Sequence, residues 1–145
     1  MVYKKAAGLV AKKGYTNVHT FKAGIPGWVK AGYALDKTGA LPKTDIPALK
    51  AEQIRAMGRD VSIVDIRVEK LYKMGCIKDS LKIPAGYISQ RYSKIPTGKK
   101  IVLVDHAGKQ SLVVGRFLNQ QGYEDVSRLQ GGIMAWSRLG FPLEK

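Results

Sequence analysis

The sequence contains one cysteine, Cys76, two histidines and only 11 acidic residues in 145 positions. A single cysteine excludes a disulfide within the chain. No apolar run approaches the ~18 residues of a transmembrane helix. The apolar stretch 6–11 is shorter than the ~7-residue minimum of a signal-peptide core, and no cleavage pattern follows it. We therefore expect no membrane span and no signal peptide in this chain, and both cytoplasm and periplasm fit the sequence.

The acidic residues form no cluster of the kind that binds Mg²⁺, so we expect neither a metal nor a cofactor. They are outnumbered by 25 lysines and arginines, which gives a formal net charge of +14. The first 50 residues are the denser basic region, with nine lysines against Asp36 and Asp45. Because these lysines are not grouped with stacking aromatic residues, we expect no specific nucleic-acid binding. The charge favours an unknown protein or a small anionic molecule as the partner.

Hydrophobic residues make up 45% of the chain, which is enough for the core of one ordinary domain. The runs SIVDI and IVLV are typical of strands buried on both faces. The pattern predicts helices over 50–57, 68–74, 111–121 and 132–139 and after Pro84, and strands over 61–66, 101–104 and 125–129, with an extended segment at 80–84. Strands that alternate with helices indicate an α/β fold, with a mainly parallel central sheet flanked by helices on both faces.

One segment leads from the buried strand 101–104 through a tight loop into the helix 111–121. In parallel sheets, ligands lie at the carboxyl ends of strands, where residues 105–110 fall. Backbone N–H groups and a helix N-terminus converge at such a loop, so the pattern favours an anion site. Its central residue, Asp105, cannot perform thiol chemistry.

The chain also contains a repeat. Residues 14–37 match residues 122–145 without gaps at an offset of 108, with nine of 24 positions identical. The identical pairs are Gly14/Gly122, Tyr15/Tyr123, Val18/Val126, Gly24/Gly132, Ile25/Ile133, Trp28/Trp136, Gly32/Gly140, Leu35/Leu143 and Lys37/Lys145. We interpret residues 1–37 as the carboxyl-terminal portion of a first domain, residues 38–47 as a linker, and residues 48–145 as a complete second domain.

Residues 1–37 are too short to form a core of their own. They must pack on the complete copy, stay partly disordered, or exchange with the equivalent piece of another chain. We expect packing through Phe21, Ile25 and Trp28, so the protein is a monomer or a dimer through residues 1–37. Trp28 and Trp136 occupy the same position in the two copies, which favours core packing for both.

Two stretches carry a family likeness: 64–84 (VDIRVEKLYKMGCIKDSLKIP) and 129–136 (LQGGIMAW). They are similar to the DVR…Y..GHI.GA.NIP and LEGG..AW motifs of rhodanese-like (sulfurtransferase) domains. The residues that match the first motif are Asp65, Arg67, Tyr72, Gly75, Ile77, Ile83 and Pro84. The complete copy resembles such a domain along its whole length. This resemblance implies a rhodanese-like fold, with structural roles for Asp65, Arg67, Gly132 and Trp136.

In active members of that family, the loop after the central strand begins with a Cys that carries a persulfide, and backbone amides stabilise it. Aligned on Gly108 and Ser111, this sequence has Asp105 at the Cys position. The resemblance thus implies a degenerate loop with no catalytic residue, made of Asp105, His106, Ala107, Gly108, Lys109 and Gln110. We expect a catalytically inactive domain with a binding, regulatory or structural role. The alternative is a piece of a tandem thiosulfate or persulfide sulfurtransferase whose active Cys loop lies in a copy upstream.

Three roles remain open for Asp105. Its carboxylate could accept the N–H groups of the loop as a built-in anion, which we favour because amides attract a negative acceptor. It could instead bind a cationic or metal partner. The third role is that of a nucleophile, although no acidic cluster is present to hold Mg²⁺ beside it.

The candidate anion- or ligand-binding residues are Asp105, His106, Gly108, Lys109 and Ser111. We interpret His106 as a solvent-facing residue and not a base, and Ser111 as a helix N-cap and not a nucleophile. Lys109 is predicted to pair with Asp105 across the loop. Cys76 is interpreted as a small buried residue, with an alternative persulfide carrier as the other possibility. Gly131 and Gly132 are expected to permit a tight approach between strand and helix.

Overall fold

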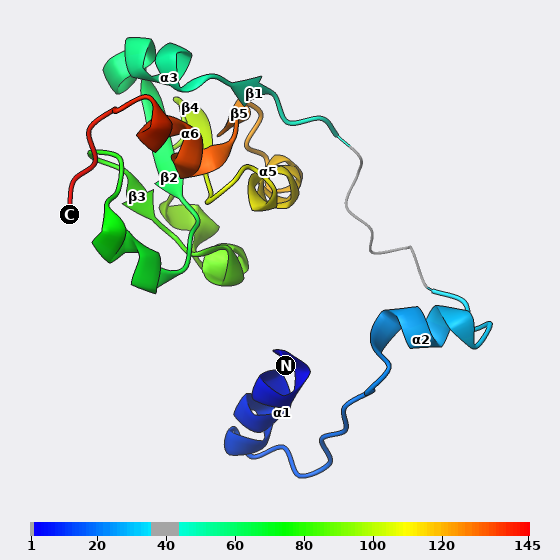
Figure 1. Cartoon of the computed structure of the whole chain (residues 1–145). Coiled ribbons are helices and arrows are strands. Elements are labelled where there is room, and N and C mark those ends of the chain that lie inside the picture. Colours follow the sequence, from blue (N-terminus) through cyan, green and yellow to red (C-terminus); the bar gives the residue numbers. More distant parts are fainter. Residues whose placement is uncertain (1, 36–43) are drawn as a thin grey trace. The chain divides into compact units, whose positions relative to one another are not determined.

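The structure is a computed structural model that describes residues 2–35 and 44–145, which fall into two separate compact units (Figure 1). The first unit contains two helices, α1 (Val2–Lys12) and α2 (Gly24–Lys30). The second contains the whole of the sheet. Most of the predicted linker, residues 38–43, lies outside the described residues.

Five strands form one sheet in the second unit: β1 (Ala48–Leu49), β2 (Val61–Asp65), β3 (Leu81–Lys82), β4 (Lys100–Val104) and β5 (Val126–Leu129). Their order is β1-β5-β4-β2-β3, and each neighbouring pair is parallel. The predicted parallel sheet is therefore confirmed. The two-residue strand β1 was not predicted, because two residues are too short to show a periodic pattern.

Helices follow the strands along the chain as predicted. They are α3 (Ala51–Met57), α4 (Ile88–Arg91), α5 (Gln110–Gln120) and α6 (Gly132–Arg138), with 3₁₀ helices η1 (Gly58–Asp60), η2 (Glu69–Met74), η3 (Ala85–Tyr87) and η4 (Tyr92–Lys94). The predicted helix over 68–74 is the 3₁₀ helix η2, which ends at Gly75. Helix α5 ends just before Gly122, whose φ of 94° suits a glycine at that position.

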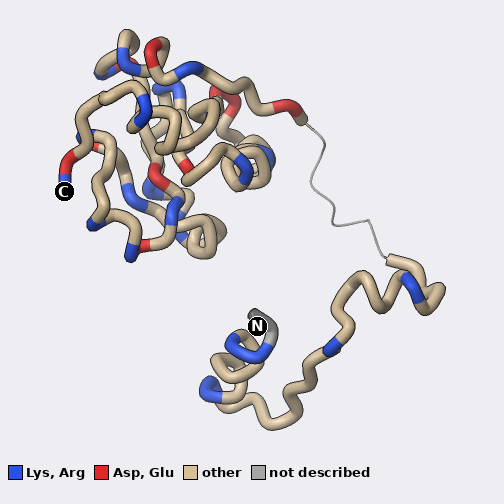
Figure 2. Tube along the Cα trace, viewed as in Figure 1, with Lys and Arg blue, Asp and Glu red and all other residues tan. Residues whose placement is uncertain are grey.

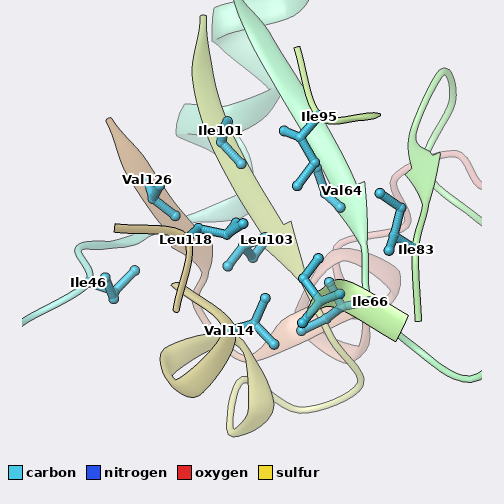
Figure 3. Close-up of a cluster of buried hydrophobic side chains, with 11 residues drawn as sticks. Ile46, Val64, Ile66, Ile83, Ile95, Ile101, Leu103, Val114, Leu118 and Val126 are labelled. Atoms are coloured by element: carbon cyan, nitrogen blue, oxygen red, sulfur yellow. The ribbon is translucent and has the colours of Figure 1, made fainter. Parts of the chain in front are cut away.

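The core lies on both faces of the sheet because side chains of β4 alternate between them. Ile101 and Leu103 point to one face, where they meet Val114 and Leu118 of α5 (Figure 3). On the opposite face lie Val102, Val104, Ile54 of α3, and Ile133 and Trp136 of α6. Complete burial of each large aliphatic side chain contributes about 1.5–3 kcal/mol. Helices thus cover both faces, as predicted.

The segment that enters the sheet is part of the core. Ile46 is 1% exposed and lies in the cluster on the α5 face (Figure 3). It packs so closely on Gly115 of α5 that a Cβ added there would lie 2.9 Å from the Ile46 side chain. The carbonyl of Pro47 accepts the N–H of Arg128 at 2.9 Å. Residues 44–47 therefore belong to the folded unit, although the sequence pattern placed them in the linker.

Gly132 allows helix α6 to begin directly against the loop that follows β4. A Cβ added at Gly132 would lie 2.5 Å from the carbonyl carbon and oxygen of His106. Its φ of 64° is also in the left-handed region. A tight approach at Gly132 is thus present, but it lies between helix α6 and the loop after β4 and not between strand and helix as predicted for Gly131 and Gly132.

We expect Gly132→Ala to lower the free energy of unfolding by about 2–5 kcal/mol, since it adds overpacking to left-handed strain. Gly140 is the matched control, because its φ is 68° and no atom lies within 4 Å of an added Cβ. Gly140→Ala should cost only the strain, about 1–2 kcal/mol. Urea unfolding followed by circular dichroism measures both, and equal losses would contradict the close packing of α6 on the loop.

Candidate functional site

The loop between β4 and α5 is folded around the carboxylate of Asp105. This residue follows β4 directly and is 1% exposed. Its Oδ1 accepts the N–H of Gly108, and its Oδ2 accepts the N–H of Ser111 at 2.9 Å. Gly108 has a φ of 91°, so the loop turns at a position that favours glycine. The negative charge therefore lies where the first turn of α5 presents its N–H groups.

Helix α6 and strand β5 hold the same loop from outside. The N–H of Ile133 donates to the carbonyl of Asp105 at 2.8 Å, and the N–H of Met134 donates to the carbonyl of His106 at 3.2 Å. The guanidinium of Arg128 donates to the carbonyls of Gly108 at 3.3 Å and Ile46 at 3.1 Å. Sequence reasoning missed Arg128, because a lone arginine in a strand gives no signal of its target.

A second anchor lies at the carboxyl end of the neighbouring strand β2. Asp65 and Arg67, 1% and 5% exposed, form an ion pair with Nη2–Oδ2 at 2.7 Å. Nε of Arg67 donates to Oδ1 at 2.9 Å, and Nη2 donates to the carbonyl of Gly75 at 2.7 Å. A bidentate pair with a further acceptor compensates for the removal of both charges from water.

Two pKa values respond to this pair. Burial alone would lower the pKa of the Arg67 guanidinium, but the hydrogen bonds and the charge of Asp65 outweigh it and raise that pKa. Burial, together with the negative charge of Asp65, raises the pKa of Tyr72 to about 12. The Tyr72 hydroxyl therefore keeps its proton at neutral pH and donates it to the carbonyl of Asp65 at 3.2 Å.

The two loops face one open pocket of about 450 Å³. Since Asp65 of β2 is in register with Val104 of β4, the residues that follow both strands lie side by side. The pocket is lined by Arg67, Val68, Leu71, Asp105, His106, Ala107, Lys109 and Gln110. Most of the predicted loop residues and Arg67 are thus brought together, whereas Gly132 supports the loop and Trp136 lies in the core. Lysines and arginines lie on several sides of this unit and are not confined to one patch (Figure 2).

Three predicted side-chain roles can be compared with the structure. His106 is exposed, as predicted. The prediction that Ser111 caps α5 is wrong: the helix begins at Gln110, the buried Ser111 hydroxyl has no hydrogen-bond partner among the described residues, and Asp105 accepts the Ser111 amide instead. The predicted Lys109–Asp105 pair is also wrong, since both carboxylate oxygens accept backbone amides inside the loop while Lys109 is exposed.

Cys76 is buried at 3% exposure, as predicted. Its thiol lies 3.4 Å from the carbonyl of Tyr72 and 3.7 Å from Nη2 of Arg67. Its backbone forms an antiparallel bridge with Glu144, with N–H···O distances of 2.7 and 2.8 Å. This bridge holds the carboxyl-terminal segment against the end of η2.

The sheet order, the loop after β4 and the α6 start agree with one protein family. Its pattern, described as the rhodanese-like domain, matches residues 49–139. The chain belongs to the rhodanese-like domain family. It is 37% identical over 99 residues to a sulfurtransferase of Allochromatium vinosum, which covers 68% of this chain and 92% of that protein. It is 29% identical to the thiosulfate sulfurtransferase GlpE of Pseudomonas savastanoi, over 68% of this chain and 91% of that one.

Solved structures show the same fold. A rhodanese-related protein of Thermoplasma volcanium superposes with a TM-score of 0.65 at 22% identity, over 68% of this chain and 97% of the other. The Alr3790 protein of Anabaena gives a TM-score of 0.61 at 25% identity, over 66% of this chain and 81% of that one. The predicted rhodanese-like fold is therefore confirmed for the second unit.

Across residues 2–35 and 44–145, no helix is long and apolar enough to cross a membrane. Over the same described ranges, no three His, Cys, Asp or Glu side chains gather as a metal site requires.

Removal of one partner from the buried pair should be costly. We expect Arg67→Met to lower the free energy of unfolding by about 3–5 kcal/mol, because it leaves the Asp65 carboxylate buried and unpaired. The exposed pair Lys78–Glu144, 3.8 Å apart, serves as the control. Lys78→Met should cost less than about 1 kcal/mol. Chemical denaturation measures both variants, and similar losses would show that the Asp65–Arg67 pair has no special structural weight.

Burial of Cys76 should protect it from alkylation. We expect iodoacetamide to label the native protein at least about 100-fold more slowly than the urea-unfolded protein, since labelling requires local opening. Mass spectrometry over time measures the modified fraction. Rapid stoichiometric labelling of the native protein would contradict the buried position of Cys76.

Proposed function

We propose that residues 44–145 form a rhodanese-like domain that does not transfer sulfur and acts as a binding or regulatory module. The inference rests on Asp105, which aligns with the sulfur-carrying cysteine of the family when Gly108 and Ser111 are matched. Its buried carboxylate accepts two loop amides, and this contact is the main support for the proposal. An aspartate has no thiol on which a persulfide can form.

The amide contacts favour the built-in anion over the other two roles of Asp105. A hydrogen bond to a charged group contributes about 1.5–3 kcal/mol, so each contact opposes release of the carboxylate. A nucleophile or a cation ligand needs an accessible oxygen, whereas this side chain is 1% exposed. Asp105 therefore occupies the place that an anionic sulfur would take in an active relative.

The pocket beside the loop supplies the binding surface of this proposal. It carries apolar side chains, Val68 and Leu71, together with the exposed cation of Lys109. Such a surface suits a small anionic molecule or an acidic segment of a protein, with the apolar side chains in contact with its hydrocarbon part.

The repeat favours a second candidate function. Residues 14–37 match residues 122–145, so this chain could be a piece of a tandem sulfurtransferase whose other copy carries the sulfur-binding cysteine. In that case the loop after the central strand of the other copy begins with Cys. The coding sequence upstream of residue 1 separates the two candidates, because a Cys-bearing loop there supports the second and its absence supports the first.

A thiosulfate:cyanide assay tests the leading proposal. We expect the unaltered chain to show no turnover above background. Asp105→Cys should accept sulfur: its thiolate attacks the outer sulfur of thiosulfate, an S–S bond forms, and sulfite leaves with the electron pair of the broken bond. Intact-protein mass spectrometry should then show one added sulfur atom.

Two controls accompany this test. Asp105→Ser has a side chain of similar size to cysteine that cannot carry sulfur, and it should stay inactive. Cys76→Ser removes the other thiol, and it should leave sulfur loading of Asp105→Cys unchanged. Turnover by the unaltered chain that disappears in Cys76→Ser would overturn the proposal and identify Cys76 as the carrier.

A further inference from the structure

The repeat is present in the structure and not only in the sequence. Helix α1 (Val2–Lys12) has the same bounds as α5 (Gln110–Gln120) after the offset of 108, and α2 (Gly24–Lys30) has the bounds of α6 (Gly132–Arg138). The matching bounds of α1 and α5 extend the repeat beyond residues 14–37, because α1 lies ahead of that stretch and its side chains differ from those of α5. Residues 2–35 therefore repeat the helix positions of residues 110–143.

Local details agree as well. Nε1 of Trp28 donates to the carbonyl of Ala34 at 3.1 Å, and Nε1 of Trp136 donates to the carbonyl of Pro142 at 3.1 Å. The glycines that start the second helix of each copy, Gly24 and Gly132, have φ of 61° and 64°. The indole hydrogen bond and the backbone conformation of the glycine that starts the second helix are thus shared by the two copies.

The two copies differ in how far their equivalent apolar side chains are exposed. Trp28 is 42% exposed and Ile25 is 65% exposed within the first unit, whereas their counterparts Trp136 and Ile133 are 4% and 5% exposed. Other apolar side chains follow the same rule: Val10 is 41% exposed against 0% for Leu118, and Phe21 is 56% exposed against 0% for Leu129. The first unit presents side chains that the second unit uses as its core.

The sheet explains this difference. In the second unit, β5 (Val126–Leu129) pairs with β1 and β4, and α5 and α6 pack on the two faces. The equivalent residues 18–21 form neither a helix nor a strand and pair with no strand among the described residues. A segment whose backbone N–H and C=O groups are not used in a sheet, flanked in sequence by two helices with exposed apolar side chains, can be added as a strand to a parallel sheet.

We infer that residues 2–35 are the closing third of a second rhodanese-like domain, and that their apolar face binds a sheet segment built like residues 44–109. The inference concerns residues 2–35 and does not depend on the role of Asp105. We commit to a segment joined directly ahead of residue 1. In the complete copy, β4 ends only six residues before α5, and a connection that short is ordered most easily within one polypeptide.

The repeat also specifies one feature of that segment. Gly115 touches Ile46 so closely that an added Cβ would lie 2.9 Å from it, and the residue equivalent to Gly115 is Ala7. The occupant therefore has a smaller side chain where the complete copy has Ile46. Residues 2–35 hold six lysines and no acidic residue, so an anionic membrane surface is the competing occupant.

The test is a fusion in which a second copy of residues 44–108, with Ile46→Ala in the added copy, precedes Met1 of the full chain. Hydrogen exchange of residues 18–21 and the emission of Trp28 in a Trp136→Phe background are the readouts. We expect exchange at 18–21 to slow by at least about 100-fold relative to the 145-residue chain, since the strand gains partners. The Trp28 emission should shift to the blue.

A matched fusion carries Val102→Asp and Val104→Asp in the added copy, which cannot form the central strand, and it should give no protection. Absence of protection in the first fusion overturns the inference. So does protection of residues 18–21 in the unfused chain, whether as a monomer or as a dimer by light scattering. A blue shift of Trp28 on vesicles of anionic phospholipid, without protection in the fusion, assigns the face to a membrane surface instead.

Discussion

Two backbone amides bind the buried carboxylate of Asp105, and the shape of the site depends on this contact. The carboxylate turns the chain from β4 into α5, because its two oxygens reach Gly108 and Ser111 at once. The carbonyls of the same turn then face outward, where the first N–H groups of α6 and the guanidinium of Arg128 bind them. Loop, helix and strand are thus fixed relative to one another, and the loop forms one wall of the pocket.

At the end of the neighbouring strand β2, a second buried carboxylate is satisfied by an ion pair. Asp65 ends β2 as Asp105 follows β4, and each carboxylate is satisfied within a few residues of its own strand. The two differ in their partner: Asp65 binds a charged guanidinium, and Asp105 binds neutral amides. Because a buried charge without a partner is expensive, both aspartates limit how far the loops can move. The pocket between them has an exposed rim at His106 and Lys109.

The elements with strong apolar patterns could be predicted from the sequence, since β2, β4, α5 and α6 each bury a regular set of side chains. The two-residue strand β1 could not, because its position depends on β5 and not on its own pattern. The sequence indicates that Asp105 is the central residue of the loop. It does not show which neighbouring groups point toward the carboxylate. Ser111 and Lys109 were misassigned because the amides of the loop compete better for the carboxylate than an exposed ammonium group does. Arg128 reaches the loop from the neighbouring strand β5, a contact that no local pattern encodes.

The backbone bridge between Cys76 and Glu144 places the carboxyl-terminal segment beside the Asp65–Arg67 ion pair. Leu143 lies where a side chain on Gly75 would be, and the carbonyl of Gly75 is the acceptor for Arg67. The end of the chain therefore packs on the turn whose carbonyl accepts Arg67. Proteolytic trimming of the last few residues would uncover that turn, and water admitted there would weaken the attraction between the two charges, with no change in any residue that lines the pocket.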